Sequence, residues 1–174
     1  ILILFLGYSL QAQKFTFLSY STKEGLAQSQ VNDIVQDNKN YIWIATLDGL
    51  SKFNGKTFKN FYQTDGLLSN RISNLSVDKK DRVWAVTSAG ISIVANDTVY
   101  PFQLNTLLEK ERVIAVNQLD SKTIISTESG GVFVFAESNL GFELQKIYKK
   151  PFEGLKIRDV CVEDYKLHIA TNKG

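Results

Sequence analysis

One stretch of the sequence returns four times along the chain at a nearly constant period. Its first copy reads YIWIATLDGL at residues 41–50, and in every copy a Thr precedes a Gly by three positions. The four pairs are Thr46/Gly49, Thr87/Gly90, Thr127/Gly130 and Thr171/Gly174. Successive Thr residues are 41, 40 and 44 positions apart. Repeats of this length, in which an aromatic or β-branched run is closed by a Gly turn, are typical of propeller blades.

The first repeat divides into strand-like runs separated by turn residues. These runs cover residues 31–36, 41–46, 50–53 and 57–62. Between the last two, Asn54-Gly55 is predicted to form a type I′ hairpin turn. A repeat of this kind folds into a four-stranded antiparallel meander. The sequence therefore predicts an all-β chain, a β-propeller built of four-stranded antiparallel blades, with about four blades present and the propeller incomplete.

The repeats define the expected domain organisation. We expect a partial propeller over residues 13–174 with repeats at about 25–65, 66–105, 106–153 and 154–174. Residues 14–24 share the spacing of aromatic residues and Gly-Leu with residues 57–67, which predicts the outer strand of a closing blade. Residues 1–12 form a short apolar run followed by small residues, typical of the remnant of a secretory signal peptide, and the alternative is a buried first strand.

Several side chains recur at fixed places within the repeats. Trp43 and Trp84 each lie inside a second strand, so packing between blades is expected rather than stacking on a sugar. Asp37 and Asp78 precede these Trp residues by six positions and are expected to accept backbone N–H bonds in a turn. In the third repeat Ile124 replaces the Trp, and a helical turn is expected near residues 107–112.

The pattern resembles the two-component regulator propeller repeat, found in the extracytoplasmic sensor regions of histidine kinases and hybrid two-component regulators of Bacteroidetes-type bacteria. The residues that carry the resemblance are Gly25-Leu26, Asp37, Trp43-Ile44, Thr46, Gly49-Leu50, Phe53 and Gly55. It is strong over residues 14–100 and weaker over residues 101–174. The resemblance implies a seven-bladed propeller, a periplasmic location, membrane anchoring and a kinase module through parts outside this chain, contact with the rest of the receptor chain, and a homodimer.

Catalytic chemistry has few candidates in this sequence. It contains one His and one Cys, and no motif that brings a nucleophile, a base or metal ligands together. His168 occupies the Trp position of the fourth repeat, so a packing role is expected, and Cys161 is expected to be a small buried hydrophobe. The net charge of +2 comes from interspersed charges without a basic run, which argues against nucleic acid. We expect no enzyme activity in this chain and no cofactor or metal.

The topology of a meander places a candidate ligand site. The Thr-x-x-Gly turns and the segments that lead into the first strands are expected to share one face of the propeller. Polar side chains there suit a carbohydrate or another polar ligand, and the candidates are Gln28, Gln30, Asn32, Asp48, Asn70, Arg71 and Ser88. Asn70 and Arg71 are expected to contact the ligand without contributing to stability. The function predicted is ligand sensing by a membrane receptor, and the alternatives are a lyase-like secreted enzyme and a structural or adhesive repeat protein.

Overall fold

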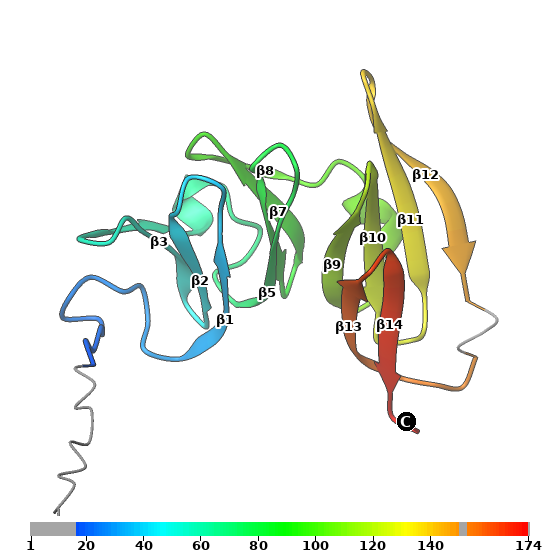
Figure 1. Ribbon diagram of the computed structural model, residues 1–174, viewed down its shortest axis with the longest axis horizontal. Helices are drawn as coiled ribbons and strands as arrows, with labels where there is room; N and C mark the ends of the chain where they lie inside the picture. Colours follow the sequence, from blue (N-terminus) through cyan, green and yellow to red (C-terminus); the bar gives the residue numbers. More distant parts are fainter. Residues whose placement is uncertain (1–16, 150–152, 174) are drawn as a thin grey trace, which may run out of the picture.

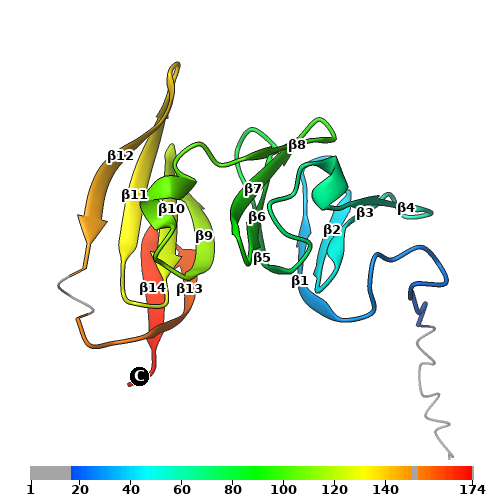
Figure 2. The ribbon, with the colours of Figure 1, turned by 180° about the vertical axis from the view of Figure 1, so that it is seen from behind.

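The computed structural model describes residues 17–149 and 153–173, which form antiparallel sheets side by side in chain order (Figures 1 and 2). Blade 1 contains β1 (Val31–Gln36), β2 (Ile42–Thr46), β3 (Gly49–Phe53) and β4 (Phe58–Phe61). Blade 2 contains β5 (Ile72–Val77), β6 (Val83–Thr87), β7 (Gly90–Ala95) and β8 (Thr98–Pro101). Blade 3 contains β9 (Val113–Leu119), β10 (Lys122–Thr127), β11 (Val132–Ser138) and β12 (Gly141–Tyr148). Blade 4 is the pair β13 (Ile157–Glu163) and β14 (Lys166–Thr171).

Each blade is a meander in which strands that follow one another in the chain also pair in the sheet. The first strands β1, β5, β9 and β13 contact one another from blade to blade, so they form the inner edge of the arrangement. Besides strands, the described residues include two short 3-10 helices, η1 (Gln63–Asp65) and η2 (Asn105–Leu108). The all-β propeller predicted from the sequence is confirmed, with three four-stranded blades and one two-stranded sheet.

The apolar side chains of the strands pack between the blades. Strand β6 is buried along its whole length, because neighbouring sheets cover both of its faces. Trp43 lies in the cluster shared by blades 1 and 2, and Trp84 lies in the cluster shared by blades 2 and 3. The Trp84 ring contacts Phe102 and Phe142 at centroid distances of 5.3 and 5.1 Å. A third cluster, with Ile157 and Val160, joins blades 3 and 4. Each blade is therefore stabilised by its neighbours.

A buried hydrogen bond fixes each Trp in its blade. The Trp43 Nε1 donates to Asp37 Oδ2 at 2.8 Å, and the Trp84 Nε1 donates to Asp78 Oδ2 at 2.9 Å. The other carboxylate oxygen of each Asp accepts two backbone N–H groups of the turn, those of Lys39 and Tyr41 in blade 1. The carboxylates thus accept backbone N–H groups of the turn, as expected. The sequence did not predict their hydrogen bonds with the Trp indoles, which form because each Asp precedes its Trp by six residues.

A charged network joins blades 2 and 3 at the ends of their strands opposite the Thr-x-x-Gly turns. The Arg82 guanidinium donates to Glu137 at 2.6 and 2.9 Å and to Asp78 at 2.6 Å. Lys80 Nζ lies 2.9 Å from Glu137. The hydrogen bonds from Arg82 lower the pKa of Glu137 below its ordinary value of 4.5; partial burial opposes this change, and Lys80 reinforces it. The bidentate geometry makes this a strong contact between blades.

Some local expectations differ from the structure. Asn54-Gly55 is not a type I′ turn, because only Gly55 has a positive φ, of 90°. The loop between Phe53 and Phe58 is longer, and Asn54 Oδ1 accepts the N–H groups of Lys56 and Thr57. The side chain thereby stabilises a four-residue loop in place of the tight turn.

The amino-terminal expectations are only partly within the described residues. The signal-peptide segment, residues 1–12, lies outside them. In the described part of the expected outer strand, residues 17–20 are not paired in a sheet and residues 22–25 form a turn. Tyr20 nevertheless packs on Phe53 and Phe58, with centroids 4.9 and 5.8 Å apart. The segment thus lies at the end of blade 1, and its role in closing a ring stays a prediction, as does the number of seven blades.

The indole bond can be tested with Trp43→Phe. This change keeps an aromatic ring but leaves Asp37 Oδ2 without its buried donor, so the free energy of unfolding should fall by about 1–3 kcal/mol. Truncation in Trp43→Ala should cost more, about 3–5 kcal/mol. Urea unfolding measures both, with exposed Tyr165→Phe as the control that should match the parent. Equal stability of Trp43→Phe and parent would show that the bond contributes nothing.

The Arg82–Glu137 contact predicts a pH dependence. Because the folded-state pKa of Glu137 is lowered, its contribution to stability is present above pH 4.5 and is lost as the pH falls through the lowered value. Glu137→Gln should therefore destabilise the protein at pH 7 and have little effect in strong acid. Thermal melts across this range measure the difference, with exposed Glu153→Gln as the control. If the melting temperature of Glu137→Gln differs from that of the parent by the same amount at every pH, Glu137 is not the source of the pH dependence.

Candidate functional site

The Thr-x-x-Gly turns join the second and third strands of the blades. In blade 1, Thr46 Oγ1 donates to the Gly49 carbonyl at 2.7 Å and accepts the N–H of Asp48 at 3.2 Å. Blade 2 repeats this bond between Thr87 and Gly90 at 2.7 Å. Gly49 has a φ of 118°, and a Cβ there would lie 2.7 Å from the Tyr62 ring. The Thr hydroxyl and the Gly conformation therefore shape the turn together.

The third repeat uses a longer turn than the sequence predicts. Thr127 bonds to Gly131, because the N–H of Thr127 donates to the Gly131 carbonyl at 2.8 Å. The expected partner Gly130 supplies the positive φ, 92°, of the longer loop. In the fourth repeat the Thr171 hydroxyl accepts the N–H of Lys173 at 3.3 Å, and Gly174 lies outside the described residues. One additional residue in this turn of blade 3 explains why Thr127 pairs with Gly131 and not with Gly130.

We use the name lead-in loops for residues 25–30, 66–71, 107–112 and 153–156, which precede β1, β5, β9 and β13. These loops lie at the same end of the blades as the Thr turns. A backbone bond joins the last residue of each loop to the turn of its own blade: Leu47 N to Gln30 O, Ser88 N to Arg71 O, Glu128 N to Arg112 O, and Asn172 N to Lys156 O. These bonds confirm the expectation that the turns and the lead-in loops share one face of the propeller. We call it the Thr-turn face.

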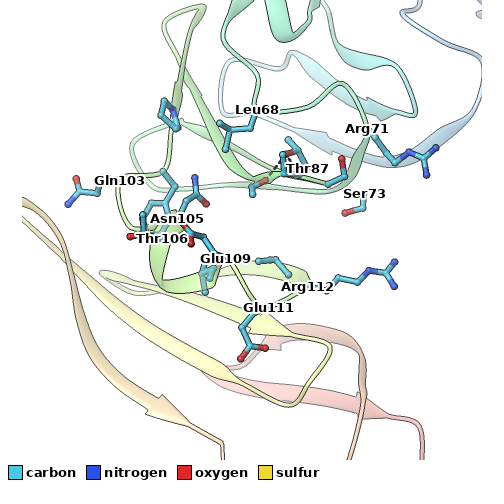
Figure 3. Close-up of a pocket in the computed structure, with 17 residues that line it drawn as sticks. Leu68, Arg71, Ser73, Thr87, Gln103, Asn105, Thr106, Glu109, Glu111 and Arg112 are labelled. Atoms are coloured by element: carbon cyan, nitrogen blue, oxygen red, sulfur yellow. Dashed lines mark hydrogen bonds between the residues drawn. The ribbon is translucent and has the colours of Figure 1, made fainter.

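A pocket of about 610 Å³ opens on the Thr-turn face between blades 2 and 3 (Figure 3). Its floor includes the buried side chains of Phe102 and Leu108. Figure 3 shows Arg71 and Arg112 pointing to one side of the pocket, and Gln103 at the opposite end. This volume is within the usual range for small-molecule sites. The pocket therefore combines an apolar floor with a polar and charged rim.

The pocket brings together only two of the candidate ligand-binding residues, Arg71 and Ser88. Both are exposed, and Ser88 Oγ donates to Ser69 Oγ at 2.8 Å. The remaining candidates, which do not line the pocket, are Gln28, Gln30, Asn32, Asp48 and Asn70. The ligand-binding role of all these residues stays a prediction.

Three of the remaining candidates, Asn32, Asn70 and Asp48, have structural contacts that the sequence did not indicate. Asn32 Nδ2 donates to the Ile72 carbonyl at 2.6 Å and so joins blade 1 to blade 2. Asn70 Nδ2 donates to Asp48 at 2.9 Å, and Asn70 Oδ1 accepts the N–H of Gln63 at 2.7 Å. Asn70 therefore joins a loop to a turn, and because both ends of its amide are bonded we expect it to contribute to stability.

Sequence reasoning missed most residues of the pocket. Among those with polar side chains are Ser73, Gln103, Thr106, Glu109, Glu111 and Arg112. The helix η2, which begins two residues before the helical turn expected at 107–112, carries Thr106 to the rim. Leu108 precedes β9 by the same five positions that separate Leu67 from β5, so the third repeat keeps the core Leu without the Gly. Counting back from each first strand would have found Arg112 as the equivalent of Arg71.

The reactive side chains lie apart from this pocket. His168 and Cys161 are register partners in blade 4 and both are exposed, so the buried roles expected for them are wrong in this structure. The reason is that their face of the sheet is not covered by another described strand. Within residues 17–149 and 153–173 there is no group of three or more His, Cys, Asp or Glu side chains placed to hold a metal ion. The same residues include no helix of the length and hydropathy needed to span a bilayer.

The neighbouring residues Asn70 and Arg71 give a matched stability test. Asn70→Ala removes two hydrogen bonds and should lower the free energy of unfolding by about 1–3 kcal/mol. Arg71→Ala removes an exposed side chain that has no partner among the described residues, so its effect should stay within about 0.5 kcal/mol. Urea unfolding of both variants measures the difference. Equal stabilities would mean that the Asn70 amide does not hold the loop.

Comparison with known proteins relates part of this chain to signalling proteins. Residues 25–48 match the family profile of the two-component regulator propeller. A stretch of 61 residues is 51% identical to histidine kinase P4 of Formosa agariphila and covers 34% of this chain and 4% of that protein. This chain thus spans a small fraction of that kinase.

Solved structures show the same fold. The extracellular domain of the putative hybrid two-component system BT3049 from B. thetaiotaomicron has a TM-score of 0.70 and 21% identity, over 87% of this chain and 23% of that one. The extracellular domain of BT4673 from the same organism has a TM-score of 0.61 and 16% identity, over 79% of this chain and 19% of that one. Residues 25–48 therefore carry a two-component regulator propeller repeat, within a chain whose sheets are arranged as blades of a β-propeller.

Proposed function

We propose that this chain is part of the ligand-sensing propeller of a membrane two-component receptor, located outside the cytoplasm. The observation that carries the proposal is the two-component regulator propeller match over residues 25–48, which coincides with β1, β2 and the first Thr turn. The likeness to extracellular domains of hybrid two-component systems supports it through the fold. In this proposal the chain binds a ligand and has no catalytic role, and a kinase module elsewhere in the receptor gives the output.

The ligand is proposed to be a carbohydrate or another polar small molecule that binds on the Thr-turn face. The pocket between blades 2 and 3 supports this, since hydroxyl, amide and guanidinium groups surround its apolar floor. Such a mixture suits a sugar, whose ring has apolar faces and a polar edge. Because the pocket lies between two blades, a bound ligand would change the packing of one blade against the next, and this change is a route for the signal.

The receptor assignment is tested by the gene and by signalling. The coding sequence beyond residue 174 should contain a transmembrane segment and a histidine kinase module, whereas an adhesion or sorting module would favour the structural alternative. The full-length protein in membranes should change its autophosphorylation when oligosaccharides are added from outside. If it instead cleaves polysaccharides to unsaturated products, which ultraviolet absorbance detects, the lyase-like alternative is correct.

The pocket itself is tested by filling it. Ser88→Trp places a large side chain at an exposed position of the rim and should abolish the autophosphorylation response without lowering the free energy of unfolding by more than about 0.5 kcal/mol. The matched control is Ser121→Trp, an exposed Ser on the opposite face of the same two blades. An unchanged response in Ser88→Trp would place the ligand on another surface.

A further inference from the structure

We propose that the ligand of the Thr-turn face is anionic and that its carboxylate or sulfate groups are bound by Arg71, Arg112 and Lys156. These residues end the lead-in loops of blades 2, 3 and 4. The inference rests on the proposed ligand-sensing function and adds the chemical class of the ligand and the residues that select it.

The three basic residues occupy one structurally repeated position. Each of their carbonyl groups accepts a backbone N–H from the residue after the Thr of its own blade, at distances of 3.0, 2.8 and 2.9 Å for Arg71, Arg112 and Lys156. The equivalent bond in blade 1 is made by Gln30 at 3.3 Å. Because the backbone is fixed in the same way in every blade, the side chains leave the chain at equivalent points around the inner edge. Three cationic groups are therefore presented along the same face.

The position requires no basic side chain for folding. The bond that fixes it uses only the backbone carbonyl, and blade 1 has Gln30 there without losing the bond. The Arg71 guanidinium and the Lys156 ammonium form no hydrogen bond or ion pair with residues 17–149 and 153–173, and both residues are exposed. These charges are available to a ligand.

Nearby carboxylates do not balance the positive charge. Glu128 lies 3.5 Å from Arg112 and 3.8 Å from Arg158, so one carboxylate faces two guanidinium groups at long distance. Glu111 is bonded to Ser129 and, at 3.2 Å, to Lys149. On the rim, Glu109 is the remaining acidic residue of the pocket. Arg71, Arg112, Arg158 and Lys156 thus leave an excess of positive charge at the ends of blades 2 to 4.

The pocket lies directly beside this charge. Figure 3 shows Arg71 and Arg112 extending to the same side, with Ser73 between them. A guanidinium binds carboxylate and sulfate groups through two parallel hydrogen bonds, which an ammonium does not do. A linear ligand with one acidic group on each of several units matches a row of cations on successive blades. An acidic oligosaccharide has this form, and its sugar rings suit the apolar floor.

Binding to the full-length receptor in nanodiscs tests the inference. The probes are tetragalacturonate, which carries carboxylates, a carrageenan tetrasaccharide, which carries sulfates, and neutral cellotetraose. At least one acidic probe should bind, more weakly as NaCl is raised because salt screens exposed charges. Cellotetraose should bind at least tenfold more weakly than that probe. The stronger acidic probe identifies the group that is recognised.

The variants assign the interaction to residues. Arg71→Ala and Arg112→Ala should each weaken binding of the acidic probe by about tenfold, the effect of losing one charged hydrogen-bonding group. Arg71→Lys should lie between Arg71→Ala and the parent because it keeps the charge but loses the planar fork. Lys79→Ala, an exposed basic residue on the opposite face, is the control and should bind as the parent does.

The outcomes separate this inference from the receptor assignment. If a neutral probe binds as well as the acidic ones, or if neither acidic probe binds, or if the Arg71→Ala and Arg112→Ala variants bind like the parent, the anionic site is wrong. The kinase response to any extracellular ligand would still support the receptor. If an acidic probe binds through Arg71 and Arg112 but autophosphorylation does not respond, the anionic site is correct and the sensing function is wrong.

Discussion

The hydrogen bond from a buried indole to a buried carboxylate is the contact on which blades 1 and 2 depend. Asp37 and Asp78 are both buried, and such a charge is costly unless donors surround it. The turn backbone and the Trp Nε1 supply these donors, as described above. Each Asp thereby closes the turn between the first two strands and orients the largest side chain of its blade. The packing between blades follows from that orientation.

Interblade contacts of two kinds reinforce this arrangement at different distances from the inner edge. Between blades 1 and 2, Asp33 Oδ2 accepts the N–H of Leu75 at 2.7 Å on the inner strands. Between blades 2 and 3, the Arg82 guanidinium joins Asp78, which holds Trp84, to Glu137. The same carboxylate therefore takes part in the fold of one blade and in its attachment to the next. Loss of Asp78 would disturb both levels of structure.

The sequence predicts the fold well because the fold depends on a repeated local pattern. The period of the Thr turns and the strand β1, predicted at residues 31–36, agree with the structure because strand alternation and turn chemistry are local properties. The pocket was less predictable. It depends on helix η2 and on the lead-in loop of blade 3, which lie where the repeat is weakest. The amide of Asn70 illustrates the same limit, since its partner Asp48 is distant in the sequence.

The backbone anchoring of the lead-in loops has a consequence for how such a protein can diversify. In blade 2 the core positions accept few alternatives, because Trp84 and Asp78 each satisfy specific partners inside the protein. The last residue of each lead-in loop is fixed only through its carbonyl, so Gln30 and Arg71 occupy equivalent places without any change in the strands. Selection can therefore alter the chemistry of one blade's rim while the scaffold stays constant. Successive blades thus work as a set of independently adjustable contacts, and new specificities can arise one blade at a time.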